Sequence, residues 1–192
     1  MKNKQLNLTS GPILSTLTEL ALPIMASSFL ATAYNITDMA WIGMLGSKAV
    51  AGVGVGGMYV WLSQGLCSLS RMGGQVNMAQ ALGRKDREAS IRYADVALQL
   101  TILFGLFFTA LCLLFTDPLL HFFNLTDPEA YASARVYMLI TCGLILLPYL
   151  TQTLTGLYTA QGDSKTPLKA NFLGLVLNMV LDPVLILGVG PF

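Results

Sequence analysis

Charged residues are scarce in this chain of 192 residues, at 11% of the sequence against about 25% in an ordinary soluble domain. The formal net charge is only +1, so the chain lacks the basic surface that a nucleic-acid partner would require. One histidine and three cysteines are too few for a dedicated His/Cys metal site. Each cysteine lies inside an apolar run, where it is expected to be a small core residue and not half of a disulfide. A cleavable signal is not expected either, because residues 1–11 are polar and the first apolar stretch is too long.

Long apolar segments are what the sequence has instead. Hydrophobic residues make up 54% of the chain, and its mean hydropathy is +0.64. Five segments are long enough to cross a bilayer, which takes about 20 helical residues, and none shows the alternation of a β-strand. The prediction is an all-α integral membrane protein, a polytopic helix bundle. The expected helices run over about 16–43, 49–82, 96–115, 136–160 and 168–188. Because the chain ends just beyond the fifth segment, we expect it to be a fragment of a longer protein.

The basic residues favour one orientation in the membrane. Cytoplasmic connections carry an excess of lysine and arginine. One set of alternating connections holds Lys2, Lys4, Arg84, Lys85, Arg87, Arg92, Lys165 and Lys169, whereas the other set holds Lys48 and Arg135. The pattern predicts a multi-pass protein of the cell membrane (an inner or plasma membrane) with a cytoplasmic N-terminus.

Two isolated carboxylates, Asp38 and Asp182, lie inside apolar segments. On insertion scales a carboxylate at the centre of a membrane helix costs about 2.5–3.5 kcal/mol. At 1.5 Å per residue, both lie about 7–9 Å below the outer ends of their helices. This matched depth favours a shared functional site over two separate structural hydrogen bonds. Asn178 lies one helical turn from Asp182 and is expected to belong to the same site.

Polar and small residues recur at spacings of three and four in four of the five segments, which places them on one face of each helix. These faces predict a water-accessible cleft, although ordinary packing of small residues is the alternative. Segment 96–115 has no clear polar face and is expected to face lipid. Arg71 is expected to face the cleft, to snorkel, or to pair with Glu19 or Asp95. The candidate residues lining the cleft are Tyr34, Asn35, Gln64, Ser68, Tyr149, Gln152, Thr155 and Asn171.

Several motifs together resemble the N-terminal part of a multidrug and toxic compound extrusion (MATE) transporter. The most specific are Gly156-Leu-Tyr-Thr-Ala-Gln-Gly-Asp-Ser-Lys-Thr-Pro167 and Asn178-Met-Val-Leu-Asp-Pro183, which resemble the loop before the fifth helix of the family and that helix itself. Leu22-Pro23 and Asn35-Ile-Thr-Asp-Met-Ala-Trp-Ile-Gly43 are similar to the first helix, and Leu82-Gly-Arg-Lys-Asp-Arg87 is similar to the junction after the second. The resemblance covers the whole chain.

The resemblance implies a protein of twelve helices in two lobes of six. This chain would supply helices 1–5 of the first lobe, and the second lobe of the same protein would be its partner. In related members, residues that match Asp38, Asn178 and Asp182 form the site for the coupling ion, H⁺ or Na⁺. Pro23 matches a proline at which the first helix can bend. No catalytic residue and no cofactor other than the coupling ion is implied, and the only metal would be Na⁺ at Asp38 and Asp182.

The leading functional hypothesis is a secondary antiporter that exports organic, often cationic, drugs or toxins in exchange for H⁺ or Na⁺. Its partners would be small organic substrates and the lipid bilayer. A flippase for lipid-linked oligosaccharides or peptidoglycan precursors, from the same superfamily, would carry more cationic cleft residues than Arg71. An intramembrane aspartyl protease is a remote alternative, because neither Asp182 nor Asp163 lies in the expected Gly-x-Gly-Asp sequence.

Overall fold

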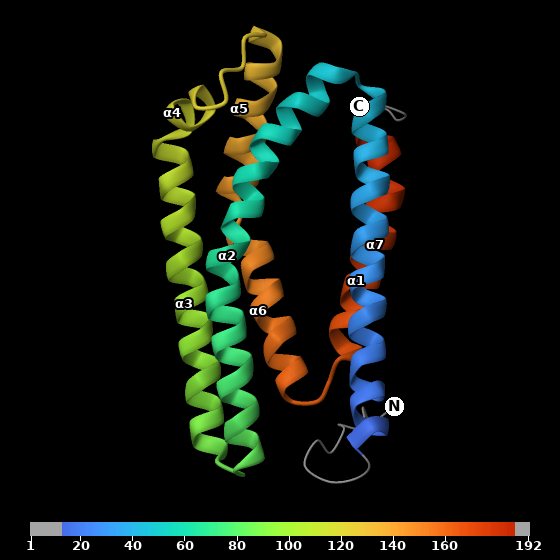
Figure 1. The fold of residues 1–192 in the computed structure, drawn as a ribbon, viewed down its shortest axis with the longest axis vertical. Coiled ribbons are helices and arrows are strands. Elements are labelled where there is room, and N and C mark those ends of the chain that lie inside the picture. Colours follow the sequence, from blue (N-terminus) through green and yellow to red (C-terminus); the bar gives the residue numbers. More distant parts are fainter. Residues whose placement is uncertain (1–12, 187–192) are drawn as a thin grey trace. The chain divides into compact units, whose positions relative to one another are not determined.

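The computed structural model describes residues 13–186, which form seven α-helices and no strands (Figure 1). The prediction of an all-α fold is confirmed. The helices are α1 (Ile13–Met44), α2 (Ser47–Gly83), α3 (Arg87–Leu114), α4 (Thr116–His121), α5 (Pro128–Gly143), α6 (Leu146–Ala160) and α7 (Lys165–Ile186).

The chain forms two compact units. Of the described residues, the first unit combines 13–44 with 158–186, and in it α1 packs against α7 although the two are far apart in sequence. The second unit is residues 45–157. In it α2 packs against both α3 and α5, and α3 also contacts α5.

Three helical stretches are long and apolar enough to cross a membrane: Thr16–Met44, Ser47–Gly83 and Arg87–Leu114. The α5–α6 pair adds a fourth if it counts as one broken span. Helix α7 covers most of the fifth expected segment, of which residues 187 and 188 lie outside the described part of the chain. The total of five spans therefore stays a prediction.

The prediction of one continuous helix over 136–160 is wrong. In the structure α5 and α6 are separate helices that meet at an angle of 45°. Pro148 explains the break. Its ring clashes with the carbonyl one turn earlier, at Leu144, and it has no N–H to donate. At the third position of α6 the missing donor is harmless, since the first four N–H groups of a helix have no intrahelical acceptor. The helix therefore restarts at Leu146.

Helix α3 begins nine residues before the expected start at residue 96. The Asp86 carboxylate accepts a hydrogen bond from the backbone N–H of Ala89 at 3.0 Å, which caps the helix. The sequence showed no clear polar face in this segment, and the face that the structure buries is mostly small and apolar. Buried residues recur at spacings of three and four along the side that packs in the unit: Ala97, Thr101, Gly105, Phe108 and Cys112.

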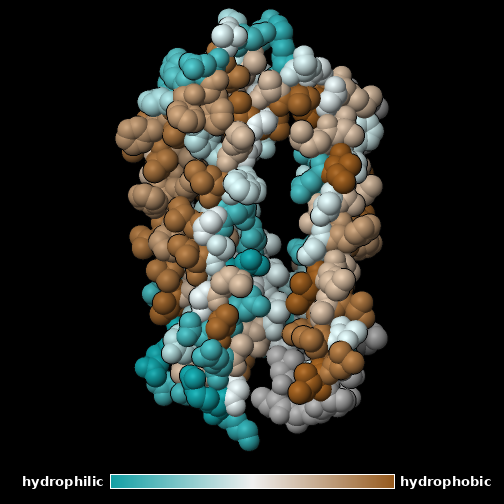
Figure 2. Space-filling model, viewed as in Figure 1, coloured by the Kyte–Doolittle hydropathy of each residue, from teal (hydrophilic) through white to brown (hydrophobic). Residues whose placement is uncertain are grey.

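The other side of α3 is apolar and exposed, as a lipid-facing helix requires. Its exposed large side chains include Leu103, Leu106 and Phe107. Figure 2 shows this flank mostly hydrophobic, with hydrophilic residues gathered at the end of the α2–α3 pair. The charged turn between the two helices lies at that end.

The core of the second unit joins aliphatic, aromatic and sulfur side chains from α2 to α6. Cys67, Cys112 and Cys142 are all buried and free, as the sequence predicts. Tyr149 is fully buried among them, and its hydroxyl donates to the backbone carbonyl of Ser63. One polar cluster sits in this core: the Thr101 hydroxyl contacts those of Ser70 at 3.0 Å and Thr153 at 2.8 Å. Hydrogen bonds among these three hydroxyl groups join α2, α3 and α6.

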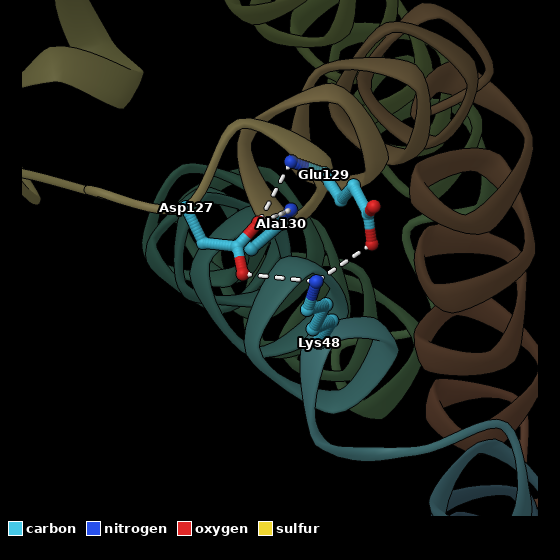
Figure 3. A network of polar contacts seen from close by, with 4 residues as sticks. All are labelled: Lys48, Asp127, Glu129 and Ala130. Atoms are coloured by element: carbon cyan, nitrogen blue, oxygen red, sulfur yellow. Dashed lines mark hydrogen bonds and ion pairs between the residues drawn. The ribbon is translucent and has the colours of Figure 1, made fainter.

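A surface network joins the beginnings of α2 and α5 (Figure 3). The Asp127 carboxylate accepts hydrogen bonds from the backbone N–H groups of Glu129 at 2.8 Å and Ala130 at 3.3 Å. Lys48 Nζ lies 3.2 Å from Asp127 Oδ2 and 2.7 Å from Glu129 Oε2. Asp127 thus caps α5, which explains why this helix begins at Pro128 and not near residue 136.

We expect Asp127→Ala to speed hydrogen exchange in the first turn of α5, whereas Asp127→Asn, which still caps, should have a small effect. The N–H groups of Glu129 and Ala130, with Lys48 beside them, hold the pKa of Asp127 below its usual range. Its stabilising effect is therefore complete above the unfolded pKa of about 3.9 and is lost as the pH falls through the lower folded value. Exchange at residues 129–132, corrected for intrinsic rates, should show this acid loss in the wild type but not in Asp127→Asn. Equal protection in the wild type and Asp127→Ala would contradict the capping role.

Candidate cation site

The packing of α1 against α7 brings together four polar side chains of the first unit. Tyr34 and Asp38 are four residues apart on α1, and Asn178 and Asp182 are four residues apart on α7. Residues at this spacing lie on one face of a helix, one turn from each other. All four side chains are partly buried, although the helices that carry them are otherwise apolar.

Specific contacts join the two pairs across the helix interface. Tyr34 and Asn178 are hydrogen-bonded through their side chains. The carboxyl groups of Asp38 and Asp182 lie close enough to repel each other when both are ionised. The Asp182 Oδ2 atom is buried and has no hydrogen-bond partner among the described residues.

The chemistry of this cluster fits a small monovalent cation better than a transition metal. Across residues 13–186 no group of three His, Cys, Asp or Glu side chains is arranged to hold a metal ion. Two carboxylates supply charge, while Asn178 supplies a neutral oxygen and donors and Tyr34 a hydroxyl. Hard oxygen ligands of this kind suit a sodium ion, and a carboxylate oxygen without a donor is equally suited to a proton. Either would relieve the repulsion between the two carboxylates.

The predicted cleft-lining residues divide between the two units. Tyr34, Asn35 and Asn171 belong to the first unit, and the remaining five belong to the second: Gln64, Ser68, Tyr149, Gln152 and Thr155. A single cleft shared by all of them therefore remains a prediction.

The prediction that Tyr149 lines the cleft is wrong. Its side chain is 0% exposed and its hydroxyl is bound to the Ser63 carbonyl, so it is a core residue of the second unit. Gln64 and Gln152 are partly buried, and Gln152 Nε2 donates to Gln64 Oε1 at 2.6 Å. This bond shows that the polar faces of α2 and α6 meet. Ser68 and Thr155 are partly buried and bond to carbonyls of their own helices, at Gly65 and Thr151.

Tyr34 is a member of the cluster that sequence reasoning named only as a candidate for lining the cleft. The structure places it against Asn178 and beside both carboxylates, and its role in a cleft stays a prediction. The signal was present in the sequence, because the interval from Tyr34 to Asp38 equals the interval from Asn178 to Asp182. Two helices that run alongside each other with matching polar intervals can pair at both levels.

Long apolar helices with two facing intramembrane carboxylates are typical of membrane proteins that move ions or solutes. The comparison with known proteins narrows this class. The MatE family matches residues 23–184, and the chain therefore belongs to the MatE family. The resemblance inferred from the sequence is confirmed.

The relatives carry names that refer to multidrug resistance or to transport. A probable multidrug resistance protein NorM from Thermotoga maritima is 31% identical over 176 residues, which cover 90% of this chain and 37% of that protein. An FAD transporter from Shewanella oneidensis is 25% identical over 192 residues, which cover 100% of this chain and 42% of that protein. A solved structure described as the outward-facing conformation of a multidrug resistance MATE family transporter matches with a TM-score of 0.88 at 25% identity, over 100% of this chain and 42% of that chain.

This chain spans about two fifths of the length of the proteins that it matches. The matched proteins are transporters and not enzymes, so the prediction that the chain is not an enzyme is confirmed, and the intramembrane protease is excluded. They are also membrane proteins, which agrees with the long apolar helices found here.

Proposed function

We propose that this chain is the N-terminal part of a secondary antiporter that exports small organic compounds in exchange for inward H⁺ or Na⁺. Asp38, Asn178 and Asp182 form its coupling-ion site, with Tyr34 as an added member. The observation that carries the proposal is the buried, unpartnered Oδ2 atom of Asp182 in the same unit as a second carboxylate. Such an arrangement is costly inside a membrane unless a proton or cation occupies it for part of the time.

Coupling follows from differential affinity between two conformations. The ion favours the conformation in which the carboxylates lie close together, because it removes their repulsion. If the organic substrate binds the other conformation better, then loading one ligand releases the other. A free-energy coupling of about 1–3 kcal/mol between the two ligands is typical of such linkage.

Transport by the full-length protein in sealed proteoliposomes tests the proposal. A pH gradient and a sodium gradient would be imposed separately while accumulation of a fluorescent organic cation is followed. We expect one gradient to drive accumulation and the other to have no effect, which also identifies the coupling ion. Accumulation that proceeds without either gradient would contradict antiport.

The proposed orientation places the N-terminus in the cytoplasm. In a background without Cys67, Cys112 and Cys142, single cysteines at the exposed positions 84 and 126 report the two sides. An impermeant thiol reagent added to whole cells should label position 126 and leave position 84 unlabelled until the cells are opened. Labelling of position 84 in intact cells would reverse the orientation.

Pro23 lies inside α1, and we propose that it sets how far this helix bends. It cannot donate to the carbonyl of Glu19, and the Glu19 side chain lies 3.6 Å from Lys165 Nζ on α7. Pro23→Ala restores the missing donor and should favour a straighter helix. We expect weaker export at a normal level of inserted protein, measured by transport and by quantitative membrane immunoblot. Unchanged export would remove the bend from the transport cycle.

A further inference from the structure

Arg71 is a partly buried cation of the second unit, and it takes no part in the proposed ion-coupling site. It lies on α2, 12 residues before the end of the helix at Gly83, which corresponds to about 18 Å at 1.5 Å per residue. The residue as a whole is partly buried, and its Nε atom is buried without any hydrogen-bond partner in the described part of the chain. An arginine keeps its charge at physiological pH and presents five N–H donors in a rigid fork.

The two carboxylates that the sequence offered as partners do not neutralise Arg71. Glu19 belongs to the first unit and is paired there with Lys165. Asp95 is exposed on α3 and makes no ion pair with Arg71. Within residues 13–186 the described ion pairs all use other basic residues. A guanidinium in this position, without a counter-charge on the described residues, would be stabilised by an external anion.

The aliphatic part of the Arg71 side chain packs against a glycine on the neighbouring helix α6. A Cβ atom added at Gly156 of α6 would lie 2.9 Å from Arg71 Cγ and 3.3 Å from Gln75 Oε1. Only a residue without a side chain therefore lets α6 approach both groups. This contact fixes Arg71 and Gln75 side by side, one turn apart on α2. An arginine side chain that only extended to the membrane surface would not need this close contact with Gly156.

Polar groups continue from Arg71 along the same seam between α2 and α6. Gln64 and Gln152 meet there through their 2.6 Å hydrogen bond, and Ser68 lies between Gln64 and Arg71 on the same face of α2. Figure 2 shows hydrophilic residues in a strip along the middle of this unit. The seam thus offers one full positive charge with neutral hydrogen-bonding groups around it and no described acidic group paired to it.

We propose that Arg71, with Gln75 beside it, is a binding site for an oxyanion, a carboxylate or phosphate group. The guanidinium fork matches the geometry of both groups and binds them through two parallel hydrogen bonds. The inference rests on the proposed export function only in assigning the oxyanion to a transported compound. The substrates would then include zwitterions and organic anions, and not organic cations alone. An anionic lipid headgroup is the second source of the same chemistry.

Direct binding to the full-length protein in phosphatidylcholine nanodiscs tests this site without any ion gradient. The probes are two xanthene dyes that differ in one group: one has a free carboxylate and the other is its methyl ester. We expect Arg71→Gln to weaken binding of the carboxylate dye by about 10- to 100-fold, the range of a charge-assisted bidentate contact. Binding of the ester should change less than about twofold. Fluorescence anisotropy measures both dissociation constants.

Three further variants separate the site from general effects of charge and folding. Arg92→Gln removes the same charge from an exposed position on α3, where Arg92 Nη2 lies 3.8 Å from Glu88 Oε1, and should leave both dyes unaffected. Gly156→Ala keeps the charge but displaces the aliphatic part of the Arg71 side chain. It should therefore weaken binding of the carboxylate dye and not binding of the ester. Arg71→Lys should restore part of the affinity, because lysine keeps the charge without the fork.

Nanodiscs that contain phosphatidylglycerol distinguish the two sources of the oxyanion. If the lipid headgroup occupies the site, phosphatidylglycerol should weaken binding of the carboxylate dye to the wild type and have no effect on Arg71→Gln. The site is supported if Arg71→Gln selectively loses binding of the carboxylate dye. It is also supported if phosphatidylglycerol competes with this dye in the wild type but not in Arg71→Gln. Equal binding by the wild type and Arg71→Gln in both kinds of nanodisc overturns it. Failure of the antiport proposal would appear instead as export that needs no ion gradient, which these binding measurements do not involve.

Discussion

Asp38→Asn and Asp182→Asn should each reduce ion-coupled export by at least about tenfold, in keeping with the usual size of coupling free energies. Each substitution keeps the size of the side chain and removes the charge that a proton or sodium ion would neutralise. The remaining carboxylate then has no like-charged neighbour, so ion binding no longer favours one conformation over the other. Export driven by an imposed ion gradient, measured in proteoliposomes, is the readout.

The double variant gives the sharper expectation. If Asp38 and Asp182 act as one site, removing both should be little worse than removing either, whereas independent residues show additive losses. Asp95→Asn is the matched control, since it makes the same change at an exposed position on α3. Its export should equal that of the wild type. Normal export by Asp38→Asn, or losses that add in the double variant, would contradict a shared site.

The helices themselves were predictable because their apolar length has one physical explanation. A stretch of about 20 apolar residues must satisfy its own backbone hydrogen bonds in lipid, and a helix does so. The prediction was weakest where local chemistry modified that rule. Pro148 breaks the fourth segment into α5 and α6, and the caps at Asp86 and Asp127 extend α3 and α5 beyond their apolar parts. Each of these signals was readable in the sequence but carried less weight than hydropathy.

The sequence could predict which helix faces carry the candidate site, but not which side chains on those faces contact each other. Spacing placed Asp38, Asn178 and Asp182 on helix faces, and the structure brings those faces together in one unit. Spacing could not show that Tyr34 bonds to Asn178, because that depends on the register between two helices distant in sequence. For the same reason Tyr149 was misassigned, since a polar tip on a helix face fits a cleft and a buried carbonyl equally well.

A substitution in the core of the second unit should have the largest effect on stability. A Cβ atom added at Gly74 on α2 would clash with the Cβ atom of Ala97 on α3. Neither atom can rotate away, so Gly74→Ala must push the two helices apart. One turn earlier on α2 and one turn later on α3, Ser70 and Thr101 meet through their buried hydrogen bond, and Thr101 also contacts Thr153. Separation of the helices therefore also weakens the polar cluster that joins α2, α3 and α6.

We expect Gly74→Ala to lower the free energy of unfolding by about 1–3 kcal/mol, the usual range for overpacking, and more if the hydroxyl cluster opens. The neighbouring Gly73→Ala is the matched control, because nothing lies within 4 Å of a Cβ atom added there. That variant should be neutral or slightly stabilising, since alanine favours a helix over glycine by about 0.5–1 kcal/mol. Denaturant unfolding in detergent, followed by circular dichroism, measures both changes.

Combining Gly74→Ala with Ala97→Gly distinguishes a steric effect from a general weakness of α2. The second substitution removes the Cβ atom that the first one meets, so the double variant should recover most of the lost stability. Recovery should fall short by about 1 kcal/mol, because glycine weakens α3 as a helix. The Ser70 and Thr101 hydroxyl groups would then be able to meet again. If Gly74→Ala is as stable as Gly73→Ala, or if Ala97→Gly adds a second loss in place of a rescue, then α2 and α3 do not pack through this contact.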